Sequence, residues 1–262
     1  MPDETAVKRS AMLTQADIQQ LLSNPSAESR ALVGGKVADV YDRRAMSERE
    51  RQLADGILRV LAQDVELAVR KSLAEHLQSN PDVPHDVARK LATDVIEVAE
   101  PVLTHSDVLT DVDLIDIIRT QPTAAQVAVA KRRTVPEPVS DALAATGVEL
   151  VVATLVRNNG AEISERTFER VINDFGQSET VTSGMVSRQK LPPGVTRRLI
   201  DVVSDSLKME LIRKHDVPED VAEKIVLKSQ EDTLKDLLGS APAERNVEQL
   251  VKSLKERGRL NT

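Results

Sequence analysis

Apolar residues recur along most of the chain at a spacing that predicts short α-helices in a repeating order. In 83–91, for example, aliphatic residues stand three and seven positions after a proline. Residues at this spacing lie on one side of an α-helix, so each such segment predicts a helix with one buried stripe. Two of the segments carry a polar residue in place of the proline. The six segments are 83–91, 110–118, 135–143, 163–171, 191–199 and 217–225.

One anchor residue in each segment sets the period of the pattern. Consecutive anchors are separated by 27, 25, 28, 28 and 26 residues, and eleven of the twelve residues three and seven positions after them are aliphatic, with Thr167 as the exception. Proline is tolerated in the first turn of a helix, and Ser or Asp can cap the free N–H groups there. Each anchor therefore predicts the start of a helix of about 10–12 residues. The anchors are Pro84, Asp111, Pro136, Ser164, Pro192 and Pro218.

A second apolar-periodic stretch precedes each anchor, as in 65–77, 148–156 and 207–212. Each unit of about 27 residues thus predicts two short helices joined by a turn. Helices of this length are marginal alone, so they need to bury their stripes against neighbouring units. We expect an all-α fold, an α-solenoid of about seven short antiparallel helix pairs of HEAT-like type with atypical units at both ends.

The flanking sequence predicts four regions. We expect a flexible tail over 1–12, an N-terminal helical cap over 13–62, the repeat solenoid over 63–238, and a linker with a C-terminal amphipathic helix over 239–262. Within the cap, Ser47 is predicted to open a helix through Leu61 with Leu53, Ile57, Leu58 and Leu61 on one apolar face. The glycine pair at Gly34 weakens the helix pattern before it. The apolar stripe of 247–254 either closes the solenoid as a cap or pairs with a partner or a second copy.

Composition narrows the class of protein. The chain has 262 residues, a net charge of −7, 1% aromatic residues and no Cys or Trp. The absence of Cys excludes disulfides, thiolate nucleophiles and Cys-ligated metals, and it is typical of a reducing compartment, so we expect a cytoplasmic protein. No apolar run approaches the ~18–20 residues of a membrane span, and the acidic N-terminus is unlike a signal peptide. The mild acidity disfavours nonspecific nucleic-acid binding.

The stretches Arg70–Leu77, Val87–Asp94, Ala99–Ser106 and Leu109–Ile115, followed later by the pattern from Leu143 to Val171, resemble a bacterial family. That family is domain of unknown function 2336, found mainly in alphaproteobacteria and built of HEAT-like repeats. The resemblance covers most of 15–230 and leaves out the tail after Gly239. It implies the helical repeat fold and the compartment, and it supplies no catalytic residue.

The candidate catalytic motifs have simpler interpretations. His76, His85-Asp86 and His215-Asp216 suggest a metal-dependent phosphohydrolase of HD type, but Asp86 stands where the helix dipole favours an acid, and the histidines lack ligand spacing on one helix. The Gly34 segment lacks the other residues of a phosphate-binding loop. An acidic cluster lacks the Gly and distal Glu of a calcium loop and fits a capped helix start. That cluster is Asp107, Asp111, Asp113 and Asp116.

Basic residues stand two to seven positions before the anchors, and stacked units would bring them to one edge. In one interpretation these cations complement helix dipoles and bond the last carbonyls. In the other they form a basic ridge that binds an acidic peptide, a phosphorylated partner or nucleic acid. Nucleic acid is the weaker of these because few aromatics can stack on bases. The candidate partner-binding residues are Arg132, Arg133, Arg157, Arg188 and Arg213.

The architecture favours a protein–protein interaction scaffold or adaptor that presents an extended surface to an unknown protein partner. We expect no enzymatic activity, no cofactor and no resident metal. The alternatives are anion or nucleic-acid binding through the basic ridge and, remotely, the HD-type phosphohydrolase.

Overall fold

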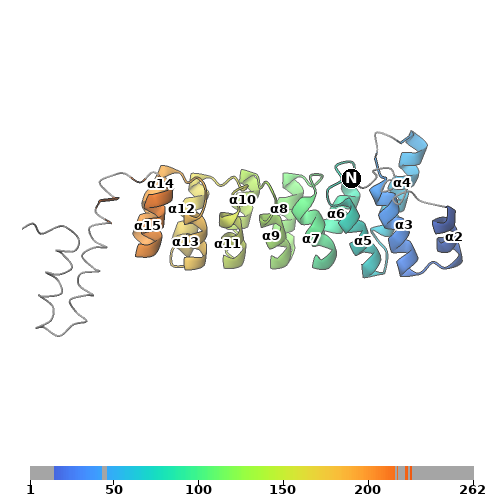
Figure 1. Cartoon of the computed structure of the whole chain (residues 1–262), viewed down its shortest axis with the longest axis horizontal. Coiled ribbons are helices and arrows are strands. Elements are labelled where there is room, and N and C mark those ends of the chain that lie inside the picture. Colours follow the sequence, from blue (N-terminus) through green and yellow to red (C-terminus); the bar gives the residue numbers. More distant parts are fainter. Residues whose placement is uncertain (1–14, 43–45, 216, 218–221, 224, 226–262) are drawn as a thin grey trace, which may run out of the picture. The chain divides into compact units, whose positions relative to one another are not determined.

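The regular elements of the chain are helices (Figure 1). The computed structural model describes residues 15–42, 46–215, 217, 222–223 and 225, and among these the β-type pairing is limited to one isolated bridge. The chain divides into two compact units, residues 1–188 and 189–262. The prediction of an all-α fold is confirmed, whereas the predicted region boundaries stay predictions.

Unit 1 contains twelve helices within its described residues, and most of them are short. They are α2 (Gln15–Ser23), α3 (Ala27–Asp39), α4 (Glu48–Leu61), α5 (Leu67–Leu77), α6 (His85–Ala92), α7 (Ile96–His105), α8 (Asp111–Thr120), α9 (Thr123–Ala130), α10 (Glu137–Ala144), α11 (Glu149–Arg157), α12 (Glu165–Phe175) and α13 (Glu179–Val186).

The helices of unit 1 pack in two rows. Helix α3 contacts α5, and the contacts continue from α5 to α7, α9, α11 and α13. On the other side α4 contacts α6, and α8 contacts α10, which contacts α12. Sequence neighbours such as α6 and α7, α8 and α9, and α10 and α11 pack across the two rows (Figure 1). Each short helix therefore buries its apolar side against the equivalent helices of the neighbouring helix pairs, as marginal helices require.

The helices that begin at the anchors share one buried stripe. In α6, α8, α10, α12 and α14 the buried residues stand three, four, seven and eight positions after the N-cap residue. This is the spacing of one helical side, so the same side faces the core in every unit. The N-cap residues are Pro84, Thr110, Pro136, Ser164 and Pro192.

The anchor predicted at Asp111 is displaced by one residue. Thr110 caps α8: its side chain accepts the N–H of Asp113, and the Asp113 carboxylate accepts the N–H of Thr110 in return. Asp111 is the first helical residue. With this shift Asp113 takes the buried position that Val87 and Val139 hold in α6 and α10. Helices α6 and α10 are eight residues long, shorter than predicted.

Helix α4 begins and ends where the sequence predicts, but only part of its predicted apolar face is buried. Ser47 caps α4 with a complete capping box. The buried face of α4 includes Leu58 and Leu61, whereas Leu53 and Ile57 are 62% and 40% exposed, so their predicted placement was wrong. The physical reason is that Ala54 and Asp55 complete the inward side at helical spacing.

Helix α3 continues through both glycines without a break. Close packing against a neighbouring helix requires a small residue at Gly34. A Cβ at Gly34 would lie 2.9 Å from Leu61 Cδ1 on α4. The glycine pair that weakens the helix pattern in the sequence therefore allows the close approach of a neighbouring helix.

Unit 2 contains α14 (Pro193–Val202) and α15 (Asp205–Lys214), which contact each other. The predicted helix start at Pro218, the flexible tail over 1–12, and the linker and amphipathic helix over 239–262 lie outside the described residues.

Candidate functional site

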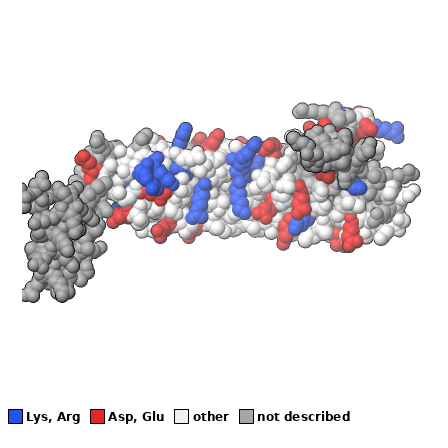
Figure 2. Space-filling model, in the orientation of Figure 1, with Lys and Arg blue, Asp and Glu red and all other residues white. Residues whose placement is uncertain are grey.

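The five predicted arginines fall into two groups by exposure. Arg132 and Arg188 are each 7% exposed. Arg133 and Arg157 in unit 1 and Arg213 in unit 2 are exposed. Figure 2 shows basic side chains in separate groups on one face, with uncharged and acidic side chains between them. Whether they bind a partner stays a prediction.

The buried arginines cap the helix one unit before their own. Arg132 follows α9, and its Nη1 and Nη2 donate to the carbonyls of Leu103 and Ser106 at the end of α7, at 2.7 and 2.8 Å. Arg188 follows α13 and donates in the same way around the end of α11. Carbonyls at a helix C-terminus have no partner within the helix, so these guanidinium groups satisfy them. Burial lowers the pKa of both arginines.

Between these two arginines, Asn158 makes the equivalent contact. Its Nδ2 donates to the carbonyls of Ala130 and Arg132 after α9, at 2.9 and 2.7 Å. Arg132 and Arg188, two of the basic residues before the anchors, therefore do bond helix-terminal carbonyls, as one interpretation predicts. The difference is that the bonded helix belongs to the preceding unit.

Arg157 is the last residue of α11 and contacts the next helix of the same row, α13. Its Nη2 donates to the carbonyl of Thr180 at 3.3 Å, and its side chain packs close to Gly184 on α13. Arg157 is not among the residues that line the hollow around Arg132 and Arg133. The structure thus brings Arg132 and Arg133 together in one site and leaves Arg157 and Arg188 outside it.

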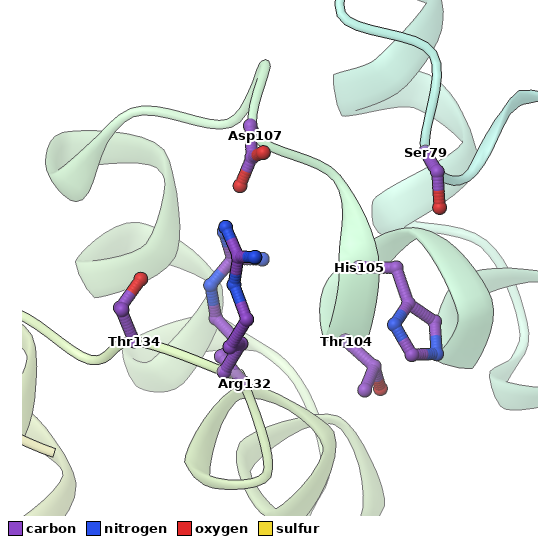
Figure 3. Close-up of a pocket in the computed structure, with 7 residues that line it drawn as sticks. Ser79, Thr104, His105, Asp107, Arg132 and Thr134 are labelled. Atoms are coloured by element: carbon purple, nitrogen blue, oxygen red, sulfur yellow. The ribbon is translucent and has the colours of Figure 1, made fainter. Parts of the chain in front are cut away.

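The hollow at Arg132 has a volume of about 250 Å³ and is lined by polar residues (Figure 3). The Arg132 side chain points toward Asp107, with Thr134 on one side and Thr104 and His105 on the other. The hollow is built from the loop after α5, the last turn of α7 with the loop after it, and the loop after α9, which are equivalent segments of three successive helix pairs. The lining residues are Ser79, Thr104, His105, Asp107, Arg132, Arg133 and Thr134.

Sequence reasoning missed Ser79, Thr104 and Thr134 because isolated hydroxyl residues carry no motif. A signal was nevertheless present. Ser79 and His105 each stand five residues before the N-cap of the following helix, and Arg132 stands four before its own. Residues at equivalent positions of successive units converge when units stack.

The backbone holds the Arg133 loop tightly against the next unit. Val135 pairs with Ala161 in the isolated parallel bridge: the Val135 N–H donates to the Gly160 carbonyl at 3.2 Å, and the Glu162 N–H donates to the Val135 carbonyl at 2.9 Å. A Cβ at Gly160 would lie 1.9 Å from the Arg133 carbonyl oxygen. Only glycine fits this approach, so the loop that carries Arg133 is fixed in place.

Three of the residues considered for metal-dependent catalysis, His76, His85 and Asp86, have separate partners, and Asp216 lies outside the described residues. His76 Nδ1 bonds to the Ser72 carbonyl within α5 at 2.7 Å. His85 Nε2 bonds to Asp113 at 2.7 Å, and Asp86 accepts two hydrogen bonds from Arg59. Within the described residues, no group of three or more His, Cys, Asp or Glu is placed to hold a metal ion.

The acidic cluster is divided among several contacts. Asp113 is 5% exposed and accepts hydrogen bonds from Thr110 and His85. Burial opposes its ionisation, but these hydrogen bonds outweigh the effect and lower its pKa to about 2. Asp116 accepts from Arg89 at 2.9 Å, whereas Asp107 lines the hollow beside Arg132.

These features define an all-helical protein of short helix pairs that support one another, with a polar hollow on the connecting loops. The chain belongs to the family described as an uncharacterised protein conserved in bacteria (DUF2336), whose model matches residues 98–262. The match includes the tail after Gly239, which the resemblance was expected to leave out, and it begins within α7. No curated protein and no solved structure matches the chain. None of the described helices has the length and apolar character needed to cross a bilayer.

Proposed function

We propose that the chain is a protein–protein interaction scaffold or adaptor of the cytoplasm, built as a HEAT-like α-solenoid with a period of about 27 residues. Its role would be to hold an extended side surface in a fixed shape for a protein partner. The absence of Cys in the sequence supports a reducing compartment.

The observation that carries this proposal is the recurrence of one contact along unit 1. Side chains that follow α9, α11 and α13 each donate to backbone carbonyls in the unit before, across 26 to 32 residues of sequence. Contacts that link each unit to its neighbour are what a stacked repeat array needs, and such arrays offer long surfaces to partners. Fold alone does not determine function, so the partner itself has to be sought by experiment.

The exposed basic residues of unit 1 are the best place to test partner binding. Arg133 is exposed and makes no side-chain hydrogen bond or ion pair with the described residues, and Arg157 is exposed with one long bond to a carbonyl. Arg132 is buried, so a substitution there would confuse loss of binding with loss of folding.

The test is affinity capture from bacterial extract on the immobilised full chain. We expect a protein partner to be retained by the wild type and reduced about tenfold or more by the double variant Arg133→Glu/Arg157→Glu. The matched control is Arg119→Glu/Arg166→Glu, which makes the same change of charge at two other exposed arginines of unit 1. Far-UV circular dichroism and thermal unfolding of both variants show whether the fold is retained.

Failure to recover any protein at near-stoichiometric amount would contradict the scaffold proposal. Equal loss in the control would show that binding depends on overall charge and not on this edge. Retention on an immobilised oligonucleotide that falls steeply with salt would instead favour nucleic-acid binding.

A further inference from the structure

The hollow beside Arg132 contains more hydrogen-bond donors than the protein itself uses. Arg132 has five N–H donors, and two of them bond to the Leu103 and Ser106 carbonyls, which leaves three. Its Nε is buried and has no hydrogen-bond partner among the described residues, and the same is true of Thr104 Oγ1. Both residues belong to the wall of the hollow. Arg188 Nε is buried without a partner in the same way, so the donors that distinguish the hollow are the remaining Nη N–H groups of Arg132 and the side chains around it that have no partner among the described residues.

The other side chains that line the hollow also lack a hydrogen-bond partner among the described residues. Within the described part of the chain, those of Ser79, His105, Asp107, Arg133 and Thr134 form no hydrogen bond or ion pair. The lining therefore combines two guanidinium groups, an imidazole and three hydroxyls with a single carboxylate. This composition is rich in donors and carries a net positive charge.

A second hollow provides the contrast. It is lined in part by Asp64, Arg70, Lys90 and Asp94, and there the arginine and both carboxylates are already paired. Arg70 Nε and Nη2 bond to the two carboxylate oxygens of Asp94 at 2.7 and 3.0 Å. Paired charges of this kind leave little capacity for a ligand, so the unpaired lining around Arg132 is not a general property of the loops.

We propose that the hollow lined by Arg132, Arg133, Thr104, His105 and Thr134 is a binding site for a phosphate group. Guanidinium groups bind phosphate through several short, charge-assisted hydrogen bonds. A carboxylate has about four acceptor sites in one plane, whereas the donors here come from the last turn of α7 and the loop after α9, on two sides of the hollow, and suit a tetrahedral anion. The two guanidinium groups disfavour a cation. The proposal does not depend on the scaffold function.

Asp107 allows a test of whether the site binds an anion or a cation. Burial lowers the pKa of Arg132, and the nearby Asp107 carboxylate partly opposes this effect, so the two groups interact. The same carboxylate repels an incoming anion. Asp107→Asn removes the repulsion and keeps the size of the side chain, and therefore strengthens anion binding but would weaken cation binding.

The experiment is a titration of the full chain with inorganic phosphate at constant ionic strength, followed by 1H–15N NMR shifts of the amides of 104–107 and 132–134. We expect saturable shifts in both segments. Arg133→Gln should weaken binding about fivefold because one charge-assisted contact is lost, and Asp107→Asn should strengthen it about threefold. The matched control is Arg119→Gln, an exposed arginine in the last turn of α8, which should leave binding unchanged.

Two further arms identify the source of the phosphate. If phosphoserine and a phosphoserine peptide bind equally, the site recognises a small phosphorylated molecule. If the peptide binds more tightly, the site recognises a phosphorylated protein segment. Both results support the phosphate site.

Three results would overturn it: shifts that stay linear with phosphate, acetate that binds as tightly as phosphate, or Asp107→Asn that weakens binding. Because the probes are defined small molecules and peptides, these failures are distinct from a failure to capture a protein partner.

Discussion

The first and second halves of unit 1 join their helices by different chemistry. From α3 to α8, charged side chains pair across helices. The pairs in this half are Arg30–Asp64, Arg59–Asp86, Arg70–Asp94, Arg89–Asp116 and His85–Asp113. After α9, the recurring links are side-chain donors to backbone carbonyls, together with the bridge between Val135 and Ala161. Ion pairs between described helices of unit 1 are confined to residues up to Lys131.

This difference predicts how the stability of each half responds to pH, to salt and to substitutions. Ion pairs depend on pH and salt, and the two that are exposed on both sides, Arg59–Asp86 and Arg89–Asp116, are weak. A buried donor to a carbonyl does not titrate near neutral pH, but its removal leaves a polar group without a partner. The first half should therefore be sensitive to solution conditions, and the second half to single substitutions.

Gly160→Ala should have the largest effect, and it falls in the second half. The new Cβ would lie 1.9 Å from the Arg133 carbonyl, so the loop has to move and the bridge at Val135 has to break. We expect a loss of about 3 kcal/mol in the free energy of unfolding. Hydrogen-exchange mass spectrometry should show faster exchange in α9 to α12.

Gly56→Ala is the control, because a Cβ there meets nothing within 4 Å. It should be neutral or slightly stabilising, since Ala is the better helix former. Equal destabilisation by the two substitutions would contradict the importance of the bridge.

Arg132→Met should have the next largest effect. Met keeps much of the apolar stem but leaves the Leu103 and Ser106 carbonyls without their donor. We expect a loss of about 2 kcal/mol, measured by urea unfolding. Arg133→Met, which changes an exposed neighbour that makes no side-chain hydrogen bond with the described residues, should change stability by less than about 0.5 kcal/mol. A similar cost for both would show that Arg132 acts only through its charge.

The sequence predicted the helices of unit 1 well because their signals are local. The apolar residues three and seven positions after Pro84 and Pro136, together with a proline that cannot continue a preceding helix, define a start and a buried side without knowledge of any neighbour. The displacement at Thr110 arose because Asp113 is polar yet buried. Thr110 and His85 both bond its carboxylate. The spacing of Thr110 and Asp113 is that of a capping box, a local signal that marks Thr110 as the N-cap, whereas the contact with His85 in the preceding helix pair is not visible in a local pattern.

The candidate site was harder to predict because exposure of an arginine is a tertiary property. Arg132 and Arg133 are adjacent and identical in type, yet one is buried and the other exposed. What separates them is register: Arg132 stands four residues before the N-cap, as Asn80 does, and Asn80 also donates to a backbone carbonyl of an earlier segment. Alignment of the units on their N-caps would have identified Arg132 as structural, but not the loops that complete the hollow.

Acid should weaken the first half of unit 1 through Asp113. Its pKa is lowered to about 2 in the folded protein, so it stabilises the fold fully above the ordinary value of 3.8, and this contribution is lost as the pH falls toward 2. The advantage of the wild type over Asp113→Asn should shrink by about 1 kcal/mol between pH 6 and pH 3. Urea unfolding at both pH values measures this, with Asp111→Asn at the exposed neighbour as the control. A constant advantage would show that Asp113 is not ionised in the way its contacts indicate.

Salt should have the smallest effect, on the exposed pair of Arg59 and Asp86. The Nε–Oδ2 distance is 2.6 Å, but the side chains are 46% and 58% exposed, so water competes with the pair. Asp86→Asn should reduce stability by about 0.5 kcal/mol at low salt and by almost nothing in about 1 M NaCl, where the screening length is about 3 Å. Glu137→Gln corrects for the helix dipole, because Glu137 stands in the first turn of α10 and forms no ion pair within the described part of the chain. The loss caused by Arg132→Met should persist at both salt concentrations, because its partners are uncharged carbonyls; if it faded with salt as the Asp86 effect does, the two halves would not differ in the chemistry that joins them.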